Sequence, residues 1–212
     1  MARAKLAPPE AHLIKVCDGM AKVIRAHAPF PSSPSLPVAP YESLFRAIVF
    51  QQLSTKAATT IYNRVLALFP DKPHPTPLQI IRAPEEKLRS AGLSRQKIAA
   101  LKDLAAKRRS GLVPDMGELE ALSDAEIIER LVAGRGVGRW TVEMYLIFTL
   151  GRPDVLPVDD LAVRKGAEKM FDRAFKPKEL DEFGARWAPW RSAAAWHFWR
   201  YMEIKTLDKP AE

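Results

Sequence analysis

Apolar residues recur at helical spacing along most of the chain. The stretch 10–27 places its apolar residues on one helical face, namely Leu13, Val16, Met20 and Val23. This pattern predicts one amphipathic helix. Residues 41–52 are mostly apolar and predict a second helix. Leu53-Ser54-Thr55 interrupts the pattern, and Ser54 or Thr55 can cap a further helix at about 56–69.

Helical patterns continue to the end of the chain, at 78–110 (two or three short helices), about 139–150, 178–187 and 190–205. Ser123 and Glu126 form a capping-box pattern that opens another helix. No segment shows sustained alternation with β-branched residues, so the sequence predicts an all-α fold. Without a long linker, residues 1–212 are expected to form a single compact unit with two helical lobes.

Glycines stand at positions 134, 136 and 138 within LVAGRGVGRWTVEMYLIFTL, residues 131–150. Because apolar residues flank them on both sides, the segment predicts a helix, a tight hairpin and a second helix. The hairpin leaves backbone N–H groups uncovered at the positive end of the second helix, where they can hold a phosphate without reading a base. The plain alternative is an αα-hairpin whose glycines only permit the turn.

The charge of the chain agrees with a polyanionic partner. The 212 residues carry a formal net charge of +8, and 47% of them are hydrophobic. This balance favours nucleic acid and an association that weakens with salt, although a merely basic soluble protein has the same balance. A basic run from Lys97 to Arg109 either contacts phosphates or is a solvated helix face.

Cysteine and histidine usage argues against a resident metal. Cys17 is the only cysteine, so one chain can form no disulfide, cysteine-based zinc site or cysteine-ligated iron–sulfur cluster. The four histidines, at positions 12, 27, 74 and 197, are scattered. No signal-peptide pattern or membrane-length apolar run is present, so a cytoplasmic protein is expected.

An acidic pair, Asp159-Asp160, follows the hairpin at the start of a helix predicted at roughly 160–172. The simplest interpretation is that one of the two caps this helix. A carboxylate downstream of a phosphate-binding hairpin also suggests an enzyme that works on nucleic acid.

Four motifs are specific when taken together: RAIVFQQLS, GVGRWTVEMY, LPVDDLAVRKG and WAPWRSAAAWHFW. They resemble the helix-hairpin-helix superfamily of DNA base-excision glycosylases, and within it the bacterial 3-methyladenine DNA glycosylase II (AlkA-like) group. The similarity runs from about residue 41 to 205. It implies an all-helical, two-lobed fold with a central cleft, and no separate N-terminal sheet domain of the kind that larger members carry.

The resemblance places the essential aspartate of the family at Asp160 and leaves Asp159 as a cap or a supporting group. Breaking an N-glycosidic bond develops positive charge on the sugar, which a fixed carboxylate stabilises. The carboxylate can also orient or deprotonate the attacking water. Members that nick the strand have a Schiff-base lysine where this chain has Trp140, so the resemblance implies a monofunctional enzyme without lyase activity.

The resemblance also implies a DNA-binding surface and a base pocket. In the family, an apolar wedge follows a glutamine between two early helices and fills the hole left by a flipped base, which matches Gln52-Leu53. The hairpin residues expected at DNA are Gly134, Gly136, Val137, Gly138, Arg139 and Thr141. Trp140, Met144 and Trp199 would line the pocket, where a flat ring suits a cationic alkylated purine. Core packing is the alternative for Leu53, Trp140 and Trp199.

The implied activity is base flipping and hydrolysis of alkylated purines, such as N3-methyladenine and N7-methylguanine, in base excision repair. The expected partner is double-stranded DNA with damaged bases, bound by a monomer in the bacterial cytoplasm, at the nucleoid. The only cofactor implied is a monovalent cation, Na or K, at the backbone carbonyls of Val132, Gly134 and Val137. Two alternatives stay open: a non-catalytic DNA-binding module in which Asp160 is only a cap, and a glycosylase for deaminated or oxidised bases.

Overall fold

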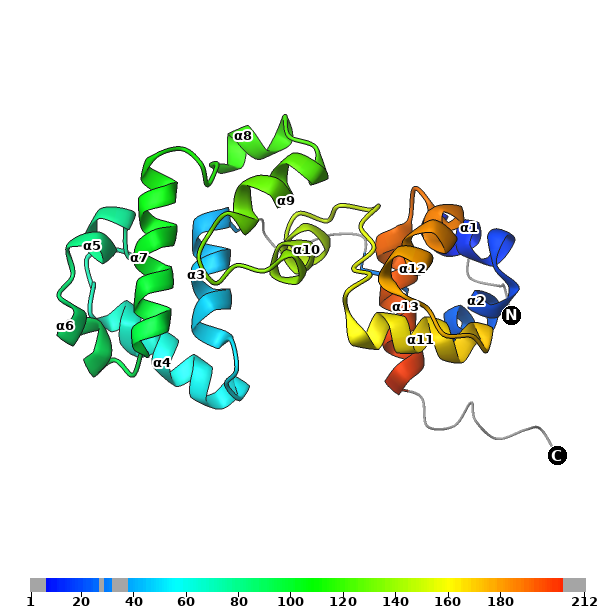
Figure 1. Cartoon of the computed structure of the whole chain (residues 1–212), viewed down its shortest axis with the longest axis horizontal. Helices are drawn as coiled ribbons and strands as arrows, with labels where there is room; N and C mark the ends of the chain where they lie inside the picture. Colours follow the sequence, from blue (N-terminus) through cyan, green and yellow to red (C-terminus); the bar gives the residue numbers. More distant parts are fainter. Residues whose placement is uncertain (1–6, 27–28, 32–37, 204–212) are drawn as a thin grey trace. The chain divides into compact units, whose positions relative to one another are not determined.

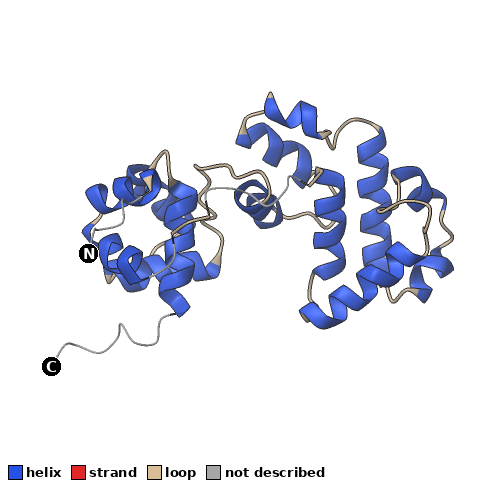
Figure 2. Cartoon of the chain, turned by 180° about the vertical axis from the view of Figure 1, so that it is seen from behind, coloured by secondary structure: helices blue, strands red, loops and turns tan. Residues whose placement is uncertain are grey.

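The computed structural model describes residues 7–26, 29–31 and 38–203. Within these ranges the chain has thirteen α-helices, one 3-10 helix and no strand, so the all-α prediction is confirmed (Figures 1 and 2). None of the described helices combines the length and the apolar composition needed to cross a bilayer. The chain divides into two compact units. We call them the terminal unit (Met1–Ser35 with Leu146–Glu212) and the middle unit (Leu36–Tyr145).

The terminal unit is built around its last helix. Its elements are α1 (Pro8–Val16), α2 (Asp18–Ala26), α11 (Leu161–Phe171), α12 (Pro177–Gly184), η1 (Ala185–Trp187) and α13 (Arg191–Glu203). Helix α13 packs against α11, α2 and α1. The prediction of one helix over 10–27 is wrong in one respect, because Cys17 adopts an extended backbone (φ −156°) and separates α1 from α2.

The middle unit contains α3 (Pro40–Phe50), α4 (Thr55–Ala67), α5 (Pro77–Arg82), α6 (Glu85–Ser90), α7 (Arg95–Arg109), α8 (Met116–Glu120), α9 (Asp124–Val132) and most of α10 (Arg139–Phe148). Helix α7 is the central helix of this unit, since it packs against α5, α3 and α6 (Figure 1). Its buried face consists of Ile98, Ala100, Leu101, Leu104 and Ala105.

Local capping chemistry sets several helix ends as the sequence predicts. Ser54 caps α4 by accepting the Ala57 N–H, and Ser123 with Glu126 forms the capping box of α9. The sequence reading missed α8, a five-residue helix opened by a second capping box. On the first turn of α10 the Trp140 side chain is 50% exposed.

Candidate active site

The predicted hairpin joins α9 to α10 through residues 133–138. Of its three glycines only Gly136 has a positive φ (+76°), a conformation that side chains other than glycine rarely adopt. Its turn is closed by the Val137 N–H, which donates to the Gly134 carbonyl at 3.0 Å. The Val137 side chain is buried, whereas Gly136 and Gly138 are exposed. The backbone around Gly138 is therefore open to a ligand, and a Cβ at that position would meet nothing within 4 Å.

Two side chains from neighbouring helices fasten this hairpin. Gln51, at the end of α3, donates its Nε2–H to the Gly136 carbonyl at 2.8 Å. Asp103 on α7 accepts the Arg135 N–H at 2.7 Å and the Lys107 ammonium at 2.6 Å. Partial burial opposes ionisation of Asp103, but these hydrogen bonds outweigh it and hold the pKa of its carboxyl below the ordinary value. The hairpin is thus held in one conformation before any ligand arrives.

The predicted wedge lies in the turn between α3 and α4. Gln52 has a left-handed backbone (φ +56°), and the Leu53 side chain that follows it is 39% exposed. The Lys97 ammonium donates to the carbonyls of Val49 at 2.7 Å and Gln51 at 2.9 Å, which caps the C-terminal end of α3. Burial lowers the pKa of Lys97. The exposure of Leu53 disagrees with an ordinary core leucine and leaves the side chain available to enter a base stack.

The wedge turn and the hairpin share a pocket of 320 Å³ within the middle unit. It is lined by Ile48, Gln51, Gln52, Ser94, Gln96, Lys97, Ala100, Arg135 and Gly136. The structure therefore brings together two predicted DNA-binding residues, Gln52 and Gly136, that lie far apart in the sequence. The sequence suggests that the basic run contacts phosphates or is a solvated helix face. Two of its residues, Lys97 and Lys107, instead donate hydrogen bonds to protein oxygens.

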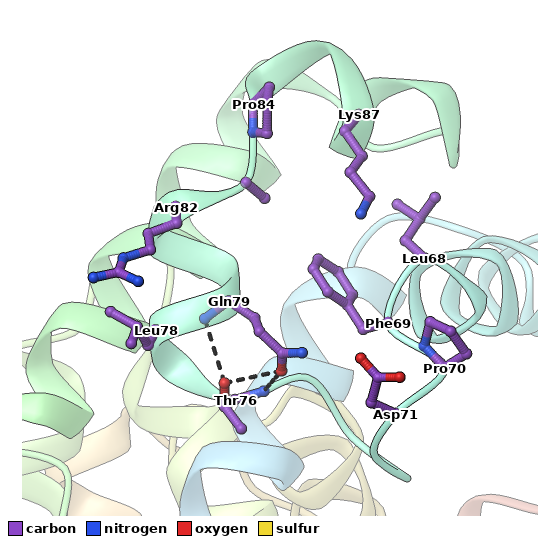
Figure 3. A pocket seen from close by; sticks show the side chains of 11 residues that line it. Leu68, Phe69, Pro70, Asp71, Thr76, Leu78, Gln79, Arg82, Pro84 and Lys87 are labelled. Carbon is purple, nitrogen blue, oxygen red and sulfur yellow. Dashed lines mark hydrogen bonds between the residues drawn. The ribbon is translucent and has the colours of Figure 1, made fainter.

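A second pocket, of 390 Å³, lies between α4, α5 and α6 (Figure 3). In it the Lys87 ammonium stands 4.9 Å from the centre of the Phe69 ring, and Thr76 forms the capping box of α5 with Gln79. None of the predicted site residues lines this pocket, so it is separate from the candidate site.

The candidate carboxylate, Asp160, is the N-cap of α11 in the terminal unit. Its Oδ1 accepts the Val163 N–H at 2.9 Å, so the capping role that the sequence suggested is present. The same oxygen accepts the Trp199 Nε1–H from α13 at 3.1 Å. Asp160 is half-buried, while its neighbour Asp159 is exposed. The carboxylate is therefore more than a solvated cap, because a second helix also holds it.

The loop that leads to Asp160 is tied to the start of α13. Arg191 binds Asp154 in a bidentate pair, with Nε–Oδ1 at 2.8 Å and Nη2–Oδ2 at 3.0 Å. Partial burial opposes ionisation of Asp154, but Arg191 outweighs it and holds the pKa of Asp154 below its usual value. The Ser192 hydroxyl donates to the Arg152 carbonyl at 2.7 Å and accepts the Val155 N–H at 3.0 Å. These bonds fix the start of the segment that leads to the carboxylate.

The remaining predicted residues lie on α10 and α13. Arg139 pairs through its Nε with the buried Glu143 at 2.8 Å, and Thr141 and Met144 are half-buried. The exposure of Trp140 disagrees with its alternative as a core residue. The Trp199 ring lies 5.6 Å from that of Phe148. Of the other C-terminal tryptophans, Trp187 is fully buried.

Sequence reasoning missed the residues that hold the site in place, namely Gln51, Asp103, Asp154, Arg191 and Ser192. Gln51, Arg191 and Ser192 lie within the quoted motifs, but no local pattern shows that these five side chains bond partners that lie far away in the sequence. Across the described residues, no cluster of three or more His, Cys, Asp or Glu side chains could hold a metal ion. One of the four histidines, His27, lies outside the described residues.

Comparison with known proteins gives consistent matches. Residues 45–189 match the HhH-GPD superfamily, described as base excision DNA repair proteins. The chain is 42% identical over 173 residues to DNA-3-methyladenine glycosylase 1 of Schizosaccharomyces pombe, which covers 81% of this chain and 76% of that protein. This confirms the predicted resemblance.

Solved structures agree with the sequence matches. The S. pombe 3-methyladenine DNA glycosylase in complex with abasic DNA superposes with a TM-score of 0.80 at 37% identity, covering 94% of this chain and 98% of that one. A DNA-3-methyladenine glycosidase from Bacillus halodurans superposes with a TM-score of 0.79 at 34% identity, covering 92% and 88%.

Proposed function

Because the chain belongs to the HhH-GPD superfamily of base excision DNA repair proteins, we propose that it hydrolyses the N-glycosidic bond of alkylated purines in double-stranded DNA. The observation that carries the proposal is the Asp160 carboxylate, which two N–H donors hold at the start of α11. The names of the similar proteins, which are 3-methyladenine glycosylases, support N3-methyladenine as a base that it releases. N7-methylguanine is included in the proposal because it is also a cationic alkylated purine.

DNA binding would begin at the middle unit. The exposed backbone of Gly136 and Gly138, next to the N-terminus of α10, can donate N–H groups to a backbone phosphate without reading sequence. Gln51 and Asp103 hold the hairpin in shape, so binding need not order it. Leu53 would enter the base stack and keep the flipped nucleotide from returning.

The chemistry would take place at the sugar of the flipped nucleotide. The C1′–N bond breaks, its electron pair leaves with the purine, and positive charge develops on the sugar. Asp160 stabilises this charge, and water then adds to C1′ and loses its proton to the carboxylate or to solvent. A purine that is already cationic leaves as a neutral base and needs no proton from a general acid. The products are the free base and an abasic site.

Two finer features belong to the same proposal. Trp140 offers no amine for a Schiff base, so the strand would stay intact after the base is released.

A monovalent cation would bind the carbonyls of Val132, Gly134 and Val137. The Gly134 carbonyl already accepts the Val137 N–H, and would offer the cation its second lone pair. The ion would need no side-chain ligand there.

The test is to incubate the protein with methylated duplex DNA and to identify the bases released by chromatography and mass spectrometry. Release of N3-methyladenine and N7-methylguanine supports the proposal. Release of hypoxanthine or an oxidised base from duplexes that carry these lesions, with none released from methylated DNA, would change the substrate class. Tight binding of DNA without release of any base would leave only a DNA-binding module.

A further inference from the structure

Trp199 contacts the candidate carboxylate with the edge of its ring. Its Nε1–H donates to Asp160 Oδ1 at 3.1 Å, and the Val163 N–H donates to the same oxygen at 2.9 Å. A stacking role, which the sequence suggests for this tryptophan, uses the face of the ring and has no need of the N–H. The observed bond is therefore an additional property of Trp199.

The two residues come from helices that are packed unusually closely. A Cβ built on Gly166 of α11 would lie 2.7 Å from the carbonyl oxygen of Phe198, the residue before Trp199. Only glycine lets the two backbones approach in this way. The Arg191–Asp154 pair and Ser192 bind the start of α13 to the loop that leads into α11. The position of the indole relative to Asp160 is thus set by backbone packing rather than by the side chain alone.

We propose that Trp199 is a positioning residue, whose indole N–H fixes the orientation of the Asp160 carboxylate. The inference rests on the proposed function of Asp160. The helix cap ties the carboxylate to its own helix, and the Trp199 N–H ties the same oxygen to α13. The negative charge is therefore already aimed when positive charge develops on the sugar.

Trp199→Phe separates this role from stacking, because phenylalanine keeps an aromatic face and loses the N–H. We expect the single-turnover excision rate to fall about tenfold or more, the scale of one lost hydrogen bond to a charged group. The loss should be similar for cationic N3-methyladenine and for neutral hypoxanthine, since the carboxylate serves both. Binding of DNA with an uncleavable abasic analogue should change less than about twofold, because this bond makes no contact with the DNA backbone.

Trp196→Phe is the matched control. Trp196 lies on the same helix and packs against the same Phe148 ring, with centroids 6.3 Å apart. Its excision rate should stay within about twofold of wild type, provided that circular dichroism and thermal melting show both variants folded. A small loss for Trp199→Phe, a loss confined to cationic bases, or an equal loss in both variants would overturn the proposal.

A spectroscopic measurement on the free protein is independent of activity. The indole N–H signal of Trp199 is identified in a ¹H–¹⁵N spectrum by its absence from Trp199→Phe. In Asp160→Asn, which keeps an oxygen to cap α11 but loses the charge, this signal should move upfield because its acceptor is weaker. An unmoved signal would contradict the bond. If the Trp199 signal moves in Asp160→Asn but the wild-type protein releases no base, the proposed function is refuted and the hydrogen bond still stands.

Discussion

A methyl group at position 166 tests how closely the helix that carries Asp160 must pack. In Gly166→Ala the new Cβ would stand 2.7 Å from the Phe198 carbonyl oxygen and 2.8 Å from the Phe198 Cβ. Ordinary contact begins at 3.4 Å, so α11 and α13 must separate by about 0.7 Å. Backbone and Cβ atoms cannot rotate away, unlike the end of a flexible side chain.

Two opposing effects decide the stability of this variant. Overpacking of this kind costs about 1–3 kcal/mol. Alanine in place of glycine inside a helix returns about 0.5–1 kcal/mol. We therefore expect a net loss of up to about 2.5 kcal/mol in the free energy of unfolding. Urea denaturation followed by circular dichroism measures it, as long as the slope of the transition is unchanged.

The substitution should also slow base release by the folded protein. A shift of about 1 Å in a reacting group can cost about a hundredfold in rate, so a shift of this size should cost tenfold or more. Single-turnover excision from methylated duplex DNA measures the rate of the folded protein. Gly117→Ala is the control, because its Cβ would come no closer than 3.5 Å to another side chain. If Gly166→Ala is as stable and as fast as wild type, the close packing does not place Asp160.

Three further variants or assays test the rest of the site. Asp160→Asn should lower single-turnover base release by at least about a hundredfold and leave DNA binding within a few-fold, because the charge on the sugar loses its counter-charge; comparable rates would remove Asp160 from the mechanism. Wild-type product should be an intact strand with an abasic site until alkali is added, and borohydride trapping of a protein–DNA adduct would contradict the assignment of Trp140. Leu53→Ala should slow excision more from a paired duplex than from single-stranded DNA, because the wedge opposes restacking; equal losses would argue for a packing role.

Local features of the fold were predictable from the sequence. The helix that starts after Ser54 and the helix that starts after Ser123 are set by side chains that bond the backbone of their own first turn. Such contacts span three residues and leave a readable signature. The break at Cys17 left no such signature, because the buried residues Leu13 and Met20 continue one helical spacing across it. The short helix α8 is too brief for periodicity to reveal.

The candidate site likewise has features that the sequence predicts and features that it does not. The helix cap at Asp160 and the turn at the hairpin glycines could be predicted because each depends on a short, continuous motif. Only the tertiary structure shows that Trp199 bonds Asp160 across 39 positions, or that Gln51 bonds Gly136 across 85. Pairing of helices that lie far apart in the chain depends on packing surfaces, which no local pattern encodes. The sequence by itself therefore predicted which residues carry the proposed chemistry, and the packing of the helices decided how firmly each is held.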